Sequence, residues 1–77
     1  MYNIFKVSNK VTVVIPVYNE SRTIYDILCK VELHCDEIIV INDCSTDDSL
    51  NLINSFAESS KTPTKVINNN KNLGIGK

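Results

Sequence analysis

The feature that most constrains this chain is an apolar run that changes abruptly into a polar corner. Ile38 to Ile41 are four consecutive apolar residues, all of them β-branched, and a largely polar stretch runs from Asn42 to Asp48. A short run of this kind is typical of a strand that is buried on both faces of a parallel sheet. The polar corner then marks the carboxyl end of an inner strand, and ligands of open α/β sheets bind outside those ends.

A helix is predicted to begin within the polar corner. The hydroxyl of Ser45 or Thr46 can cap a helix N-terminus, and Asp47 and Asp48 would then place negative charge in the first turn. The segment from Ser59 to Pro63 ends this helix. Its apolar stripe consists of Leu50, Leu52, Ile53, Phe56 and Ala57.

Three further segments complete the predicted pattern. Val11 to Val17 is a second inner strand, and Pro16 should lie near its end because proline cannot donate a ladder hydrogen bond. A helix follows from Ser21 to about residues 33–35, and a third strand covers Thr64 to Asn68. The first helix is indicated by apolar residues at helical spacing, Ile24, Ile27, Leu28 and Val31.

The order β-α-β-α-β predicts an α/β fold with a three-stranded parallel sheet and two crossover helices. Right-handed crossovers place the strands in the order 3-2-1, as in one half of a doubly wound nucleotide-binding sheet. Residues 1–10 are predicted to form a lead of mixed polarity, and no linker divides the 77 residues. We therefore expect a single domain.

Charge and composition exclude several classes of partner. Lys and Arg total 8 against 9 Asp and Glu, so the net charge of -1 gives no electrostatic basis for binding nucleic acid or an anionic membrane. The longest apolar run, Val11 to Val17, is interrupted by Thr12 and Pro16 and is too short to span a bilayer. The first residues lack the features of a signal peptide. Cys29, Cys35 and Cys44 follow no disulfide or zinc spacing, which indicates reduced thiols in a cytoplasmic protein.

Two polar corners are expected to face one crevice, because neighbouring parallel strands lie about 4.8 Å apart. One corner carries Pro16, Tyr18 and Glu20, and the other carries Asp43. No glycine-rich dinucleotide fingerprint or P-loop follows the first strand. A calcium loop starting at Asp43 is disfavoured, because Asp48 stands where the sharp turn needs glycine.

Acidic residues without glycine suit recognition of a base and ribose better than recognition of phosphates. Asp43 can accept the ring N–H of uracil or the N–H groups of guanine, Glu20 can accept ribose hydroxyls, and Tyr18 offers a flat face to a base. Because these carboxylates would repel a diphosphate, a divalent cation should be needed, and no residue of the chain is an evident ligand for it. Two interpretations stay open: Asp43 can simply end a strand and cap a turn, and Tyr18 can be a half-buried edge aromatic.

Three sequence blocks resemble the opening of a family 2 glycosyltransferase, with the polyprenol-phosphate sugar synthases among the most similar branches. The blocks are residues 13–20 (VVIPVYNE), 37–47 (EIIVINDCSTD) and 72–77 (NLGIGK). The resemblance implies a GT-A fold, a UDP- or GDP-linked sugar donor, Mg²⁺ or Mn²⁺, and inverting transfer to an acceptor such as a polyprenyl phosphate or a saccharide. It also implies that Pro16, Tyr18, Glu20 and Asp43 match nucleotide-contacting positions.

The chain departs from the family pattern at two positions of the second block. Asn42 stands where the family often has the first of two aspartates, whereas the second aspartate, Asp43, is present. Cys44 replaces a frequent glycine or asparagine. If that corner requires a positive φ, cysteine is a poor choice there.

The resemblance also implies that residues 1–77 are one partial domain, the nucleotide-binding half of a glycosyltransferase that stops before the D-x-D metal motif and the acid that activates the acceptor. We therefore expect no catalytic residue, no metal ligand, no bound cofactor and no transfer by this chain alone, and any membrane contact would come from missing parts. The alternative is a non-catalytic nucleotide-binding or protein-assembly module on the same half-sheet.

Self-association is a further expectation from this partial domain. The first predicted strand would be an inner strand of the complete domain, so its outer edge, along Val11, Val13 and Ile15, should lack a neighbour here. Exposed strand edges recruit other strands. We expect a dimer across that edge or an exchanged segment.

Overall fold

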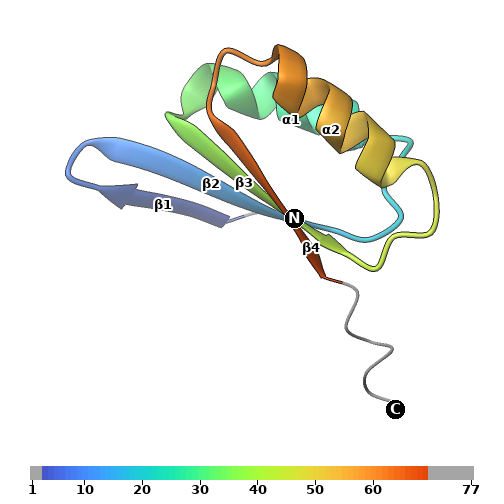
Figure 1. Cartoon of the computed structure of the whole chain (residues 1–77). Coiled ribbons are helices and arrows are strands. Elements are labelled where there is room, and N and C mark those ends of the chain that lie inside the picture. The colour runs from blue at the N-terminus through green and yellow to red at the C-terminus, as the bar shows by residue number, and fades with distance from the viewer. Residues whose placement is uncertain (1–2, 70–77) are drawn as a thin grey trace.

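A four-stranded sheet with one layer of helices forms the fold in the computed structural model, which describes residues 3–69 (Figure 1). Helices α1 and α2 both lie on the same face of the sheet (Figure 1). Neither helix of the described segment has the length and apolar character needed to cross a bilayer. In chain order the elements are β1 (Asn3–Val7), β2 (Lys10–Val17), α1 (Ile24–Val31), the short 3₁₀ helix η1 (Glu32–His34), β3 (Glu37–Asp43), α2 (Ser49–Ser59) and β4 (Thr64–Asn69).

The sheet has the order β1-β2-β3-β4 and is mixed rather than wholly parallel. Strands β2, β3 and β4 are parallel, which confirms the three predicted strands and their order. Strand β1 pairs antiparallel with β2, so the prediction of a three-stranded sheet, with no strand in the lead of mixed polarity, was wrong. All five residues of β1 are exposed, and a strand that buries nothing leaves no clear alternation of apolar and polar residues in the sequence.

A two-residue turn at Ser8 and Asn9 joins β1 to β2. Val7 pairs with Lys10, and the two residues between them have φ values of 50° and 71°. Two consecutive positive φ values characterise the type I′ hairpin turn, whose twist matches that of the flanking strands. The local geometry of this turn therefore brings β1 back onto β2.

The β1–β2 pairing removes the basis of the predicted dimer edge. Ile4 pairs with Val13 and Lys6 with Val11, so the outer edge of β2 already has a neighbour. The expected free edge along β2 was therefore wrong, and the outer strands of the sheet are β1 and β4. Self-association itself stays a prediction.

The hydrophobic core fills the space between the sheet and the helices. Alternate residues of β2 and β3 point into it, and the intervening residues face the other side, as the period of a strand requires. Full burial of each such side chain stabilises the fold by roughly 1.5–3 kcal/mol. The buried apolar residues are Val13, Ile15, Val17, Ile24, Leu28, Val31, Ile38, Val40, Ile53 and Phe56.

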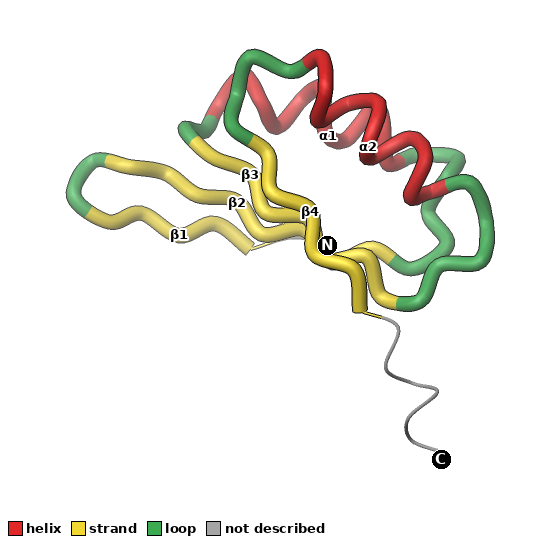
Figure 2. The backbone as a smooth tube through the Cα atoms, in the orientation of Figure 1, coloured by secondary structure: helices red, strands yellow, loops and turns green. Residues whose placement is uncertain are grey.

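The second face of the sheet has no helix over it among the described residues (Figure 2). Ile39 and Ile41 on this face of β3 are therefore half-buried, whereas Ile38 and Val40 are buried. The prediction that this strand is buried on both faces was wrong for this reason. An apolar run of this kind suits a strand with helices on both faces of the sheet, but here helices cover only one face.

We predict that an Asn-Gly turn in place of Ser8-Asn9 will stabilise the protein. Asn-Gly is the preferred pair for a type I′ turn because both residues tolerate positive φ, so Ser8→Asn combined with Asn9→Gly should raise the free energy of unfolding in urea by about 0.5–1 kcal/mol. Ser8→Pro should lower it, because proline fixes φ near −65°. Equal stability of the two variants would contradict a hairpin at this position.

Candidate functional site

Two loops meet at the carboxyl end of the parallel strands, as the sequence predicts. Residues 18–23 connect β2 to α1, and residues 44–48 connect β3 to α2. The tube in Figure 2 shows both connections at the same end of the sheet. Hydrogen bonds between the two loops confirm that they are in direct contact.

Asn19 is the centre of this contact. Its backbone N–H donates to Ser45 Oγ at 3.0 Å, and its side-chain Oδ1 accepts from the N–H groups of Thr46 at 2.7 Å and Asp47 at 3.3 Å. Its φ is 50°, a left-handed value that asparagine adopts more easily than most residues. Asn19 was not among the predicted site residues, although an asparagine that follows a strand and Tyr18 is a usual signal for a turn with side-chain-to-backbone hydrogen bonds.

Ser49 and Asp47 make the remaining contacts between the loops. The N–H of Glu20 donates to the fully buried Ser49 Oγ at 2.9 Å, and the N–H of Ser21 donates to Asp47 Oδ2 at 3.1 Å. The other carboxylate oxygen of Asp47 accepts from the Ser49 N–H at 2.9 Å. The hydrogen bond from the Ser49 side chain lowers the pKa of Asp47 to about 2, and backbone N–H donors from Ser49 and Ser21 act in the same direction.

The predicted helix start was wrong by several residues. Helix α2 begins at Ser49 with Asp48 in the N-cap position, no side chain makes the capping hydrogen bond, and no acidic residue lies in the first turn. Ser45 and Asp47 bond instead to the loop after β2, so the residues expected to cap the helix hold the two loops together.

The four residues predicted to contact a nucleotide all lie at this end of the sheet and are exposed. Pro16 is in β2, opposite Ile41 and one residue before the strand ends. Tyr18 follows β2 directly and is 60% exposed. Glu20 accepts from the Thr23 hydroxyl at 3.3 Å, and Asp43, the last residue of β3, accepts from Asn69 Nδ2 at 3.1 Å.

These contacts place Glu20 beside the start of α2 and Asp43 beside the end of β4. Their joint contact with one nucleoside stays a prediction. The third sequence block of the resemblance, residues 72–77, lies outside the described residues.

At the end of β3, Asn42 is a buried polar side chain and Cys44 lies at a corner of the backbone. Asn42 is only 5% exposed, its Nδ2 donates to Asn68 Oδ1 at 3.2 Å, and its Oδ1 is buried with no hydrogen-bond partner among the described residues. Cys44 has a φ of 60°, so this corner does require a positive φ, and its thiol donates to the Asn69 carbonyl at 2.9 Å. The ends of β3 and β4 are thus linked by side chains as well as by the ladder.

A hollow of about 230 Å³ opens between these strand ends and the first turn of α2. Its walls combine amides, a thiol, a hydroxyl and one leucine, and no Lys or Arg of residues 3–69 contributes to them. The lining residues are Asn42, Cys44, Ser45, Leu50, Asn68 and Asn69.

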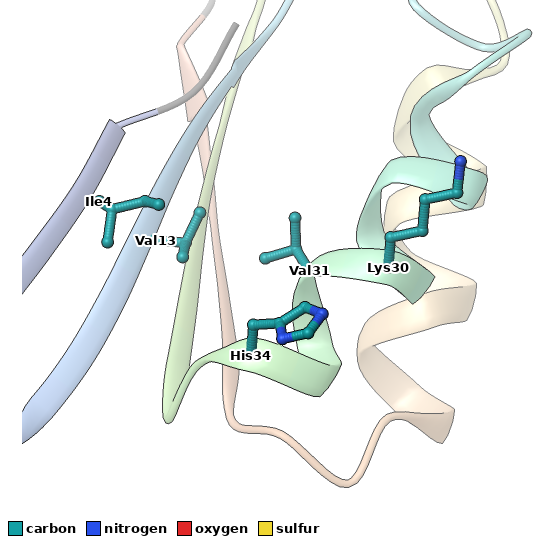
Figure 3. Close-up of a pocket in the computed structure, with 5 residues that line it drawn as sticks. All are labelled: Ile4, Val13, Lys30, Val31 and His34. Carbon is teal, nitrogen blue, oxygen red and sulfur yellow. The ribbon is translucent and has the colours of Figure 1, made fainter.

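A second hollow, of about 120 Å³, lies elsewhere. Figure 3 shows the apolar side chains of Ile4, Val13 and Val31 approaching from β1, β2 and α1, with Lys30 and His34 beside them. Val13 pairs with Ile38, the second residue of β3, so this hollow is near the amino ends of the strands and apart from the two loops. His34 is exposed.

The described residues do not fit the divalent cation that the resemblance implies. Within residues 3–69, no three His, Cys, Asp or Glu side chains lie close enough together to hold a metal ion. The acidic corner, Asp43 to Asp48, directs its carboxylates to backbone and amide donors instead.

We predict that Asn19→Ala and Asn19→Gly will both weaken the contact between the loops. Either change removes an acceptor shared by the Thr46 and Asp47 N–H groups, at a cost of about 1–2 kcal/mol in free energy of unfolding. Glycine retains access to positive φ, so Asn19→Gly should be the milder change in urea unfolding. Wild-type stability of Asn19→Gly would show that the side-chain hydrogen bonds contribute nothing.

We also predict an acid-dependent contribution from Asp47. Its folded-state pKa of about 2 is below the unfolded value of 3.8, so its stabilisation is complete only above about pH 5 and is lost as the pH falls through the folded-state pKa of about 2. Asp47→Asn should therefore be less stable than wild type at pH 6 in urea unfolding, and the difference should shrink near pH 2. Asn54→Ala, an exposed position on α2 with no ionisable side chain, is the matched control, and its difference in stability from wild type should be the same at both pH values.

Comparison with known proteins agrees with this arrangement. The family model for glycosyl transferase family 2 matches residues 12–77. Several curated relatives are undecaprenyl-phosphate 4-deoxy-4-formamido-L-arabinose transferases. This chain is 34% identical to the protein of Pseudomonas fluorescens over 70 residues, 36% identical to that of Pseudomonas savastanoi pv. phaseolicola over 70 residues, and 35% identical to that of Klebsiella pneumoniae over 71 residues. These alignments cover 83–84% of this chain and 21–22% of the relatives.

The chain thus spans about a fifth of the length of these relatives. No solved structure gives a significant match. Because the family model covers most of the chain, including β3, β4, both helices and both loops of the candidate site, the chain belongs to glycosyl transferase family 2.

Proposed function

We propose that this chain is the nucleotide-sugar-binding portion of an inverting glycosyltransferase. The donor is a UDP- or GDP-sugar, and the acceptor is a polyprenyl phosphate or a saccharide. The observation that carries the proposal is the pair of hydrogen-bonded loops at the carboxyl ends of β2 and β3, within a domain of family 2. In open α/β sheets this is where ligands bind.

The proposed contacts use the exposed residues of these loops. Tyr18, which is 60% exposed, presents a ring face for stacking, and Pro16 lies one residue before the end of β2. Glu20 and Asp43 supply carboxylate oxygens that accept hydrogen bonds from the nucleoside. The hydrogen bonds around Asn19 hold the two loops in register, so these groups need little reordering when the ligand binds.

The catalytic groups and the metal site of the complete reaction are assigned to the part of the relatives that this chain does not cover. A divalent cation, when bound, would neutralise the charge of the departing diphosphate, and a base would take the proton of an acceptor hydroxyl. The described residues contribute binding and orientation of the nucleoside to this reaction.

The relatives, which are named as undecaprenyl-phosphate sugar transferases, favour a polyprenyl phosphate as acceptor. The three free thiols, Cys29, Cys35 and Cys44, fit a reducing compartment, so we place the reaction on the cytoplasmic side, with any membrane contact made by parts that this chain does not include.

Titration with UDP and GDP, with and without Mn²⁺, tests the proposal. We expect chemical-shift changes in the residues of both loops, and we expect Asp43→Ala to weaken them by tenfold or more because it removes a carboxylate acceptor. Asp26→Ala, an exposed position on α1, is the control and should bind as wild type does. Sugar transfer by the pure 77-residue chain is not expected, and turnover would contradict the division of roles proposed above.

A protein-assembly module is the second candidate. It is favoured by exposed apolar side chains on the face of the sheet away from the helices, Phe5, Val7 and Ile67, which are 53%, 70% and 44% exposed. Absence of any response to either nucleotide, together with concentration-dependent light scattering, would support this candidate in place of the first.

A further inference from the structure

The outer edge of β1 is open to another strand. β1 is the first strand in the order of the sheet, all five of its residues are exposed, and no strand of residues 3–69 lies beyond it (Figure 1). An edge strand presents a row of unpaired backbone N–H and C=O groups, and natural proteins usually protect such an edge with charges or proline. β1 has one charge, Lys6, against three apolar side chains that are more than half exposed, Ile4, Phe5 and Val7.

Hydrogen bonds at Val11 of β2 show which way the backbone groups of that strand point. The Val11 N–H donates to Asp36 Oδ2 at 2.8 Å, and the Val11 carbonyl accepts from the Asp36 N–H at 2.8 Å. Asp36 directly precedes β3, so the backbone groups of Val11 point towards β3. Because the direction alternates from residue to residue in a strand, the backbone groups of Lys10 and Thr12 point towards β1.

The same alternation fixes the direction of the backbone groups in β1. Val7 and Phe5 pair with the two residues of β2 that point towards β1, so their own N–H and C=O groups point at β2. A two-residue turn is commonly closed by a hydrogen bond between its flanking residues, here Val7 and Lys10, which agrees with this direction. The N–H and C=O groups of Ile4 and Lys6 therefore point outwards, away from β2.

These outward groups limit how a second copy of β1 can pair with the first. In an antiparallel pair, hydrogen-bonded residues lie directly opposite each other, so outward residues must face outward residues. With the two-fold axis at Phe5, Ile4 of each copy lies opposite Lys6 of the other, which makes two hydrogen-bonded pairs. An axis at Lys6 would oppose two like charges, and an axis at Ile4 would leave one hydrogen-bonded pair within residues 3–7.

The side chains also favour an axis at Phe5. The two Phe5 rings would lie opposite each other in a non-hydrogen-bonded pair, where side chains approach most closely, and aromatic pairs of this kind stabilise a sheet. Phe5 is on the face away from the helices, because its ladder partner Thr12 alternates with the buried Val13. A two-fold axis perpendicular to the sheet keeps the helices of both copies on the opposite face, so they do not obstruct the two rings.

We propose that a second copy of this chain binds antiparallel along the outer edge of β1, with the two-fold axis at Phe5, so that two four-stranded sheets become one. Such a contact uses the same edge of both copies, so assembly through it stops at a dimer. The other outer strand, β4, suits a partner strand less well, because it ends in Asn68 and Asn69, a residue type that is uncommon in strands. The inference goes beyond the proposed function and does not depend on it.

Sedimentation equilibrium of the wild-type chain and two lysine variants tests the use of this edge. We expect the wild-type mass to rise from monomer to dimer with increasing concentration. Phe5→Lys should raise the dissociation constant of the dimer about tenfold or more, because it sets two positive charges opposite each other. Asn3→Lys adds the same charge on the same face of β1 but lies opposite Val7 of the second copy, so its constant should stay within about twofold of wild type.

Disulfide trapping tests the register. The Cα atoms at position 5 of the two copies would lie about 4.5 Å apart, within the range that a disulfide spans, so Phe5→Cys should give a cross-linked dimer with oxidised glutathione. In Val7→Cys the two introduced thiols would be about 13 Å apart along the strands, and little cross-linked dimer is expected. Wild type controls for the three native thiols, and peptide mass spectrometry identifies the bridged position.

Amide hydrogen exchange gives a readout that needs no variant. The outward N–H groups of Ile4 and Lys6 should exchange more slowly as the protein concentration rises, because the second copy then accepts their hydrogen bonds. The N–H groups of Phe5 and Val7, which point at β2, should change little.

The outcomes separate this inference from the proposed function. A constant monomer mass up to about 1 mM overturns the dimer and leaves the proposed nucleotide binding as it stands. A dimer that Phe5→Lys leaves unchanged, or that Val7→Cys traps as well as Phe5→Cys does, uses another surface or register and also overturns the inference. Should Phe5→Lys fail to fold, the cross-linking and the wild-type amide exchange decide.

Discussion

Parallel pairing of β2 with β3 is the constraint from which the rest of the site follows. Val13 to Val17 run beside Ile38 to Asn42 in register, so both strands end at the same edge and both must continue into loops there. The two helices return the chain over one face, which brings each loop to the start of a helix. Side chains far apart in the sequence are thereby placed within hydrogen-bonding distance of each other.

The contact between the loops shows how a small domain organises a polar site with few residues. Asn19 adopts a left-handed conformation that points its backbone N–H and its amide oxygen at the other loop. The fully buried Ser49 and the ionised Asp47 accept two more N–H groups of the first loop. Backbone donors that would otherwise lie unpaired at the ends of strands and helices are satisfied by side chains of the neighbouring loop.

The sequence predicts what depends on local pattern and misses what depends on distant partners. The apolar runs of β2 and β3 and the helical spacing of Ile24, Leu28 and Val31 identify the main elements, because burial dictates those periods. The start of α2 could not be predicted, because Ser45 and Asp47 bond to residues 26 positions away rather than to the helix. Strand β1 was missed because no part of it is buried.

At the candidate site, the sequence predicted the location of the polar corners but not their connections. Asp43 and Glu20 do lie at the ends of neighbouring strands, yet the residues that join the loops are Asn19 and Ser49, whose roles depend on backbone conformation and burial. The buried oxygen of Asn42 is likewise visible only in three dimensions.

Because the helices cover only one face of the sheet, the central strands and β1 should differ in the free energy of local unfolding. The central strands are held by the core, whereas all of β1 is exposed and is held to the sheet by its ladder to β2. Segments with few buried apolar contacts open at much lower free energy than the global transition. Transient fraying of β1 would expose the hydrogen-bonding edge of β2 without unfolding the core. The edge of β2 could then pair with another strand while the two loops at the carboxyl ends of the parallel strands keep their hydrogen bonds.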